Sequence, residues 1–327
     1  MKRRFFLQTV GAAGIAAASC STKTPAPSQN ELFNFVHFSD VHVQPESGAR
    51  EGLLAAIEKM NSLKPDLAIS GGDLIMDALA VDEQRAVMLY DMYIECSDNI
   101  DMPLHNVMGN HEIFGIYDPE KVPENHPDWG KEMFKKRLGE GKTYRSFDFK
   151  GVHFLLLDSM GIEKRTDRPG YEYIGEIGTE QMNWLKQDLA GIGADTPVIA
   201  VSHIPLYTLY PQITNGPTFQ NARGTVITDG KELYDLLMQY NLLAYFFGHI
   251  HVNETFVYKN AKFIDTGAVS AAWWSGPRDG HPEGFNLVHV YGDRVETEYI
   301  TYGWDASKYT PKKQDAEVFP LAQPVQV

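Results

Sequence analysis

The chain has 327 residues, of which 43% are hydrophobic and 22% are charged, and its formal net charge is −14 at pH 7. This composition is typical of a globular enzyme and excludes intrinsic disorder, collagen and coiled-coil architectures. The acidic balance argues against binding of a nucleic-acid polymer, because phosphate backbones are held by positive charge. A small anionic substrate remains compatible with this charge if bound metal ions reverse the local field.

The first nineteen residues predict an export signal. Lys2, Arg3 and Arg4 precede a short stretch rich in Gly and Ala, which ends in small residues before Cys20. The arginine pair resembles a twin-arginine signal, and residues 17–20 resemble a bacterial lipobox. We expect cleavage before Cys20 and lipidation of its thiol, which would anchor an extracytoplasmic lipoprotein to a membrane of the bacterial cell envelope. A plain secretory signal without lipid is the alternative.

The rest of the chain predicts one domain between two less ordered ends. Residues 20–32 are polar and contain proline, which predicts a flexible tether, and residues 306–327 predict a loose C-terminal tail. Residues 33–305 contain no linker-like change in composition. Cys20 and Cys96 are the only cysteines, which excludes a disulfide framework and a zinc finger. We expect Cys96 to be a buried, inert thiol in a helix.

Apolar runs alternate with amphipathic stretches along this domain. The predicted strands are residues 33–38, 67–70, 105–108, 152–157, 198–202, 243–247, 262–265, 287–291 and 295–301. The predicted helices are residues 50–63, 82–97, 129–138, 179–189 and 229–240, with Thr179 as a helix start. This alternation predicts a layered α/β fold.

Side chains that can bind metal ions follow five of the predicted strands. Asp40 and His42 follow the first strand, and an extended backbone would direct both to one side. The other candidates, each placed just after a strand, are Asp73, Asn110, His203, His249 and His251. Open α/β sheets form their sites at these strand ends. Oxygen and nitrogen donors without cysteine suit Mn, Fe, Zn or Ni, and seven donors are enough for two divalent metal ions.

These residues carry a family resemblance. The blocks Asp40-x-His42, Gly72-Asp73, Gly109-Asn110-His111-Glu112, Ser202-His203 and Gly248-His249-x-His251, in this order, resemble the calcineurin-like metallophosphoesterase family. The resemblance covers about residues 33–300 and implies an αββα fold, in which a two-layered β-sandwich is flanked by helices. It implies that one ion is held by Asp40, His42 and His251, and the other by Asn110, His203 and His249, with Asp73 bridging them.

The resemblance also implies a reaction. A metal pair would lower the pKa of a bridging water, and the resulting hydroxide would attack phosphorus in line, while His111 would serve the leaving oxygen as acid or charge stabiliser. Met76 replaces the iron-binding tyrosine of purple acid phosphatases, and residues 75–78 lack the Asp-Arg-Gly stretch of protein serine/threonine phosphatases. We expect a phosphodiesterase. A scavenging phosphomonoesterase is the alternative, and a non-catalytic surface binding lipoprotein is a further one.

Substrate choice is expected to come from two long aromatic loops, residues 204–227 and 271–285. In the second loop, Trp273 and Arg278 are candidate substrate-binding residues, and the neighbouring Trp274 could share in stacking on a base or aryl group. The expected partners are a small phosphoester substrate and, through the lipid anchor, a membrane; no obligate protein partner is evident. The other histidines are expected to be structural: His37, His105, His126, His153, His281 and His289.

Overall fold

The computed structural model describes residues 30–309 and contains two large β-sheets. The first sheet has five strands in the order β13-β12-β1-β2-β3. Strand β1 lies at its centre, parallel to β2 and antiparallel to β12. The strands of this sheet are β1 (Phe33–Phe38), β2 (Leu67–Ser70), β3 (Leu104–Asn106), β12 (Phe285–Val290) and β13 (Val295–Ile300).

The second sheet has six strands in the order β10-β11-β9-β8-β5-β4. Its central strands β5, β8 and β9 are parallel, and antiparallel partners lie at both edges. Its strands are β4 (Arg145–Phe149), β5 (Val152–Leu156), β8 (Pro197–Val201), β9 (Asn241–Phe247), β10 (Asn253–Tyr258) and β11 (Ala261–Thr266). A separate hairpin is formed by β6 (Met160–Lys164) and β7 (Tyr171–Gly175).

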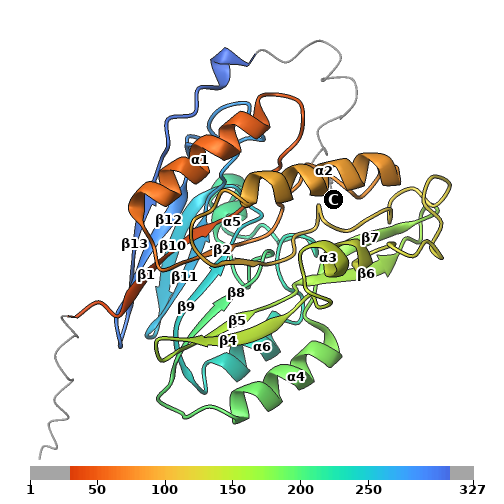
Figure 1. The fold of residues 1–327 in the computed structure, drawn as a ribbon. Coiled ribbons are helices and arrows are strands. Elements are labelled where there is room, and N and C mark those ends of the chain that lie inside the picture. Colours follow the sequence, from red (N-terminus) through yellow and green to blue (C-terminus); the bar gives the residue numbers. More distant parts are fainter. Residues whose placement is uncertain (1–29, 310–327) are drawn as a thin grey trace, which may run out of the picture.

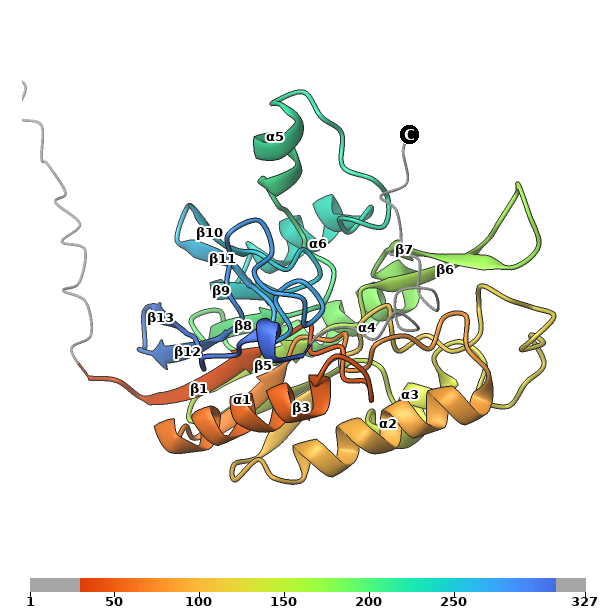
Figure 2. The same ribbon diagram turned by 90° about the horizontal axis from the view of Figure 1, so that it is seen from above.

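Helices cover the outer faces of both sheets (Figure 1). Helices α1 (Ala49–Leu63) and α2 (Glu83–Ser97) lie over the first sheet, and α4 (Gly178–Ala190) and α6 (Gly230–Leu237) lie over the second. Two shorter helices are α3 (Glu132–Arg137) and α5 (Tyr210–Asn215), and a 3-10 turn spans Ala306–Lys308. Figure 2 shows α5 standing away from the layers. The predicted fold, a β-sandwich flanked by helices, is confirmed.

Side-chain alternation along the strands explains the layers. In β1, Phe33 and Phe35 enter an apolar cluster between the two sheets, while Val36 and Phe38 join the cluster under the helices. In β5, Phe154 likewise enters the cluster between the sheets, while the next residue, Leu155, joins the cluster under the helices. Because both faces of the central strands are buried, these strands appear in the sequence as continuous apolar runs.

The structure corrects several of the secondary-structure elements predicted from the sequence. Strands β4, β6, β7 and β10 were not predicted, because they lie at sheet edges or in the hairpin and contain many polar residues. Thr179 does not start a helix: α4 begins at Gly178 with Ile177 as N-cap. The Asp229 carboxylate accepts the backbone N–H groups of Ile177 and Gly178 at 3.0 and 2.9 Å. A side chain fifty residues away therefore replaces the local cap.

Some predictions concern residues outside the described range. Cys20, the export signal (residues 1–19) and most of the tether and C-terminal tail lie there. Within residues 30–309, no helix is long and apolar enough to cross a membrane. Cys96 is buried in α2 as predicted, and burial raises the pKa of its thiol.

Candidate metal centre

The predicted metal-binding residues meet at one edge of the sandwich. Each follows the carboxyl end of a strand: β1, β2, β3, β8 or β9. Three groups of side chains have ligand atoms within 4.8 Å of one another. They are Asp40 with His42 and His251, His42 with Asp73 and His111, and Asp73 with His203 and His249. Because His42 and Asp73 each belong to two groups, the three groups form one continuous cluster.

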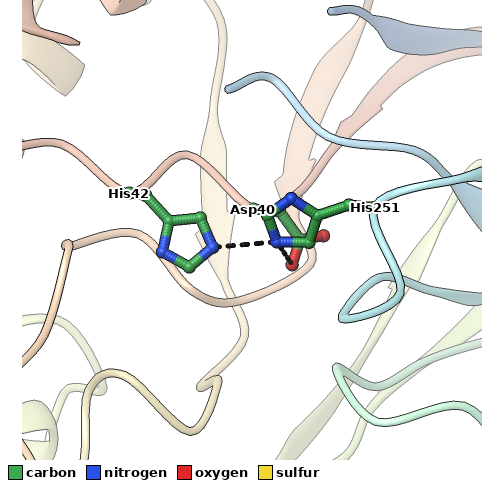
Figure 3. A group of neighbouring side chains, drawn as sticks. All are labelled: Asp40, His42 and His251. Carbon is green, nitrogen blue, oxygen red and sulfur yellow. Dashed lines mark hydrogen bonds and ion pairs between the residues drawn. The ribbon is translucent and has the colours of Figure 1, made fainter. Parts of the chain in front are cut away.

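Asp40, His42 and His251 form one end of this cluster (Figure 3). The Nε2 atoms of the two histidines lie 3.0 Å apart, and Nε2 of His251 lies 3.3 Å from an oxygen of Asp40. All three side chains are at most 2% exposed. The Asp40 carboxylate also accepts the backbone N–H of His249, which ties this end of the cluster to the β9 loop.

The Asp73 carboxylate lies at the centre of the cluster. Its Oδ2 atom lies 3.1 Å from Nε2 of His203, 3.7 Å from Nε2 of His42 and 3.8 Å from Nε2 of His111. Its Oδ1 atom accepts the backbone N–H of His111 at 2.9 Å. The loop after Gly109 approaches Asp73 so closely that a Cβ on Gly109 would lie 2.2 Å from Asp73 atoms. A side chain at that position would push the two loops apart.

Five of the seven predicted ligands have a left-handed backbone. Positive φ angles of 47 to 73° occur at Asp40, His42, Asp73, His249 and His251. The prediction that an extended segment directs Asp40 and His42 to one side is therefore wrong. Left-handed turns bring their side chains together instead. Such residues cost on the order of 1–3 kcal/mol each and concentrate at functional sites, where surrounding structure holds them in place.

Hydrogen bonds orient three of the imidazoles. The Nδ1 atoms of His203, His251 and His111 lie against the carbonyl oxygens of Gly71, Ala271 and Met76. Donation of Nδ1–H to these oxygens directs the Nε2 atom of each ring at the cluster. Oδ1 of Asn110 is buried and has no hydrogen-bond partner within residues 30–309, and the buried Nε2 of His203 faces the Asp73 carboxylate. This amide oxygen, the imidazole nitrogens and the carboxylates fit divalent metal ions with oxygen and nitrogen ligands.

Burial and mutual charge perturb the ionisable groups of the cluster. Burial lowers the pKa of His249 to about 4, and the neighbouring His203 adds to this effect. Burial also opposes protonation of His203, but the Asp73 carboxylate outweighs it and raises the pKa of His203 to about 9. For Asp40, burial favours the neutral acid, yet His251 and His203 lower its pKa to about 2. Opposed shifts within one cluster are typical of functional sites.

Glu112 belongs to the site, although the sequence pattern did not single it out as a candidate. Its fully buried carboxylate accepts backbone N–H groups from Asp73, Leu74 and Ile75 at 2.7 to 3.2 Å, and from Gly109 at 2.7 Å. Burial and the Asp73 charge raise the pKa of Glu112 to about 7. The carboxylate fastens two ligand-bearing loops together. Its place directly after Asn110 and His111 was the available signal.

The aromatic residues of the 271–285 loop divide into two roles. Trp274 is 1% exposed, packs against Trp304, and donates from Nε1 to the His42 carbonyl oxygen at 3.1 Å. It belongs to the core, so its predicted share in a stacking platform is wrong. Trp273 is half-buried, with its ring centroid 4.4 Å from that of His251 and the Arg278 guanidinium 5.3 Å from its own centroid. Trp273 and Arg278 therefore lie beside the cluster.

The remaining histidines lie outside the three groups of ligand atoms. His37 bonds to Thr266, and His153 lies between two aspartates at 2.8 Å from each. None of the six histidines that were expected to be structural belongs to the groups found among residues 30–309.

A model of the calcineurin-like phosphoesterase family matches residues 33–253, which include all seven predicted ligands. The chain belongs to the calcineurin-like phosphoesterase family. A dimetal phosphatase from Danio rerio has the same fold, with a TM-score of 0.56 and 16% identity over 84% of this chain and 100% of the other.

Relatives of both phosphatase and phosphodiesterase type resemble the chain. Bovine serine/threonine-protein phosphatase CPPED1 is 27% identical, with 77% of this chain and 72% of the relative covered. A cAMP/cGMP dual specificity phosphodiesterase of Mycobacterium tuberculosis is 26% identical, covering 82% and 79%. A probable cyclic nucleotide phosphodiesterase of Rhodococcus erythropolis is 24% identical, covering 82% and 83%. The chain thus belongs to a family with phosphatase and phosphodiesterase relatives, and it contains His and Asp clusters suited to divalent metal ions.

The Glu112 contacts predict that replacement of a single carboxylate oxygen destabilises the protein. Glu112→Gln replaces an acceptor oxygen by an NH2 group that faces backbone donors, so we expect a free energy of unfolding lower by about 2 kcal/mol. Loosened ligand loops should also weaken Mn²⁺ binding by about tenfold or more. Urea unfolding and calorimetric Mn²⁺ titration measure these effects, with the exposed Glu120→Gln as matched control. Unchanged stability and affinity would contradict the role of Glu112.

Proposed function

We propose that the protein hydrolyses a phosphodiester with two divalent metal ions. The observation that carries this proposal is the continuous cluster of carboxylate and imidazole groups centred on Asp73. Asp40, His42 and His251 would hold one ion, and Asn110, His203 and His249 the other. Asp73 would contact both, because its Oδ2 atom lies among imidazoles of both sets.

Two bound ions would supply Lewis-acid polarisation of the phosphoryl group and a nucleophilic water of lowered pKa. The chain's own residues place the substrate and manage the leaving group. His111 lies beside Asp73, and its Nδ1–H is engaged by the Met76 carbonyl oxygen, so Nε2 is the atom available to the leaving oxygen. Burial opposes a charged ring there, but Asp73 and Asp77 outweigh it and raise the pKa of His111, which favours a proton on Nε2.

The loop after Asp73 favours a diester over a monoester. Leu74 and Ile75 are buried, and Met76 follows, so this loop supplies no cation for the second negative charge of a monoester. The two cyclic nucleotide phosphodiesterases among the relatives support this choice, while the phosphatase relatives keep monoester hydrolysis as the second candidate. Trp273 and Arg278 would contact the organic part of the ester and its phosphate.

Comparison of an aryl phosphodiester with the matching aryl phosphomonoester tests the reaction. We expect the Mn²⁺-loaded protein to prefer the diester, Asp73→Asn to lose metal-dependent turnover, and His111→Gln to lower kcat by about 100-fold while metal binding persists. His289→Gln, at a histidine outside the cluster, should behave as wild type. Preference for the monoester would assign the phosphatase alternative. Two bound metals without turnover of either ester would favour the binding lipoprotein.

Substitution of Trp273 tests its role in substrate binding. Trp273→Leu should raise KM for the aryl diester by about tenfold with little change in kcat, because ring stacking contributes about 1 kcal/mol or slightly more. Arg278→Gln should act in the same direction. Trp129→Leu, which removes a half-buried tryptophan from another part of the fold, is the control. An unchanged KM in both loop variants would assign Trp273 and Arg278 to rim packing.

We further propose that the protein is exported by the twin-arginine route and anchored by a lipid on Cys20. The support is the order of a basic start, a short apolar stretch and small residues before Cys20. Radiolabelled palmitate should label the protein in bacterial cells and fail to label Cys20→Ser, which should move to the soluble envelope fraction. Absence of label from both forms would refute lipidation and leave the plain secretory signal.

A further inference from the structure

A second pocket lies away from the metal-binding cluster. It has a volume of about 670 Å³ and is lined mainly by residues 141–146, which include the start of β4, and by residues 177–184 at the start of α4. A hydrogen bond of 2.7 Å from Ser146 to Asp188 joins these two elements. None of the residues that line the pocket belongs to the three groups of metal-binding side chains. Occupation of this pocket would therefore be independent of the metal centre's ligands.

The pocket is positively charged in an acidic protein. Residues 131–145 contain six basic and two acidic residues, whereas the whole chain has a net charge of −14. Four basic residues line the pocket, namely Lys131, Lys135, Lys142 and Arg145, against two acidic ones, Asp158 and Glu180. A concave surface with an excess of one sign of charge concentrates ligands of the opposite sign. The charge pattern favours an anionic ligand.

Several donors in the pocket are free to bind that anion. Lys131 is held by Asp158 at 2.6 Å, and Lys135 by Glu132 at 2.7 Å, but Lys142 is exposed and has no ion pair within residues 30–309. Asp229 caps Gly178 at the start of α4, while the backbone N–H groups of Thr179 and Glu180 have no acceptor among the described residues. An ammonium beside free N–H groups suits a phosphate or phosphonate.

The pocket also carries an aromatic wall. Tyr144 and Trp184 are half-buried lining residues, and their ring centroids lie 4.9 Å apart with the planes tilted by 49°. A flat ring of a ligand could stack on either Tyr144 or Trp184, since stacking tolerates many ring chemistries. The volume is that of a site for a small organic molecule and exceeds what a bare ion needs.

We propose that this pocket binds an aryl or heteroaryl phosphate as a second, non-catalytic ligand. The phosphate would lie between Lys142 and the first turn of α4, and the ring against Tyr144 and Trp184. Asp158 sits under the pocket between Lys131 and Gln181, and the next residue, Ser159, accepts the N–H of Ile204, which directly follows His203. Asp158 and Ser159 thus connect the pocket to the His203 loop, while no lining residue belongs to the cluster.

Titration of the Mn²⁺-loaded protein with phenylphosphonate, followed by tryptophan fluorescence, tests this site. We expect a saturable change that is lost in Trp184→Phe, which separates this pocket from any binding at the metal centre. Lys142→Glu should weaken the apparent affinity by about tenfold or more, and Lys142→Arg should restore it, because one charge-assisted contact is worth about 1.5 kcal/mol or more. Turnover of the aryl diester should be unchanged in these variants.

Lys164→Glu, at an exposed lysine of β6 without an ion pair in residues 30–309, makes the same charge change elsewhere and should leave affinity unaltered. An absent Trp184 signal, or equal affinity in wild type and Lys142→Glu, would overturn the proposal. Equal affinity for benzamide would refute the anion contact. Equal affinity for inorganic phosphate would refute the contribution of the ring.

Discussion

The buried carboxylate of Glu112 is the contact on which the metal-binding edge depends. Two oxygen atoms accept four backbone N–H groups from the loops after β2 and β3, and the Tyr90 hydroxyl donates to the Glu112 carbonyl oxygen from α2. These loops carry Asp73, Asn110 and His111. A buried carboxyl group that meets several donors fixes their positions far more strictly than apolar contact would, because each unmet donor would be buried without a partner. The position of Asp73 follows from this arrangement.

The same edge stores conformational strain that the sandwich must offset. The left-handed residues that follow the carboxyl ends of the strands could relax if the strands were free to shift. They are not, because the strands are buried on both faces by the apolar clusters between the sheets and under the helices. Close-packed interiors transmit such constraints instead of deforming. The rigid layers and the strained loops are therefore two parts of one arrangement, in which stability in the core maintains ligand geometry at the edge.

The sequence predicted those parts of the molecule that leave a strong local pattern. Buried strands such as Phe33–Phe38 are continuous apolar runs, and the metal-binding blocks follow them directly. Polar edge strands leave no such pattern, since one face or one edge meets water. Contacts between distant residues also escaped prediction: the capping of α4 by Asp229, the grip of Glu112 on two loops, and the burial of Trp274. Each depends on tertiary placement that composition and periodicity do not encode.

Strand order has a consequence for how the chain acquires its structure. Strand β1, near the start of the domain, pairs on one side with β2 and on the other with β12, whose residues 285–290 are made more than two hundred positions later. During synthesis one edge of β1 therefore stays without its partner until almost the whole domain has left the ribosome. An unpaired apolar strand invites association with other chains. For most of its synthesis the growing polypeptide therefore exposes this unpaired edge. Chaperone binding or rapid completion of the chain would limit its aggregation.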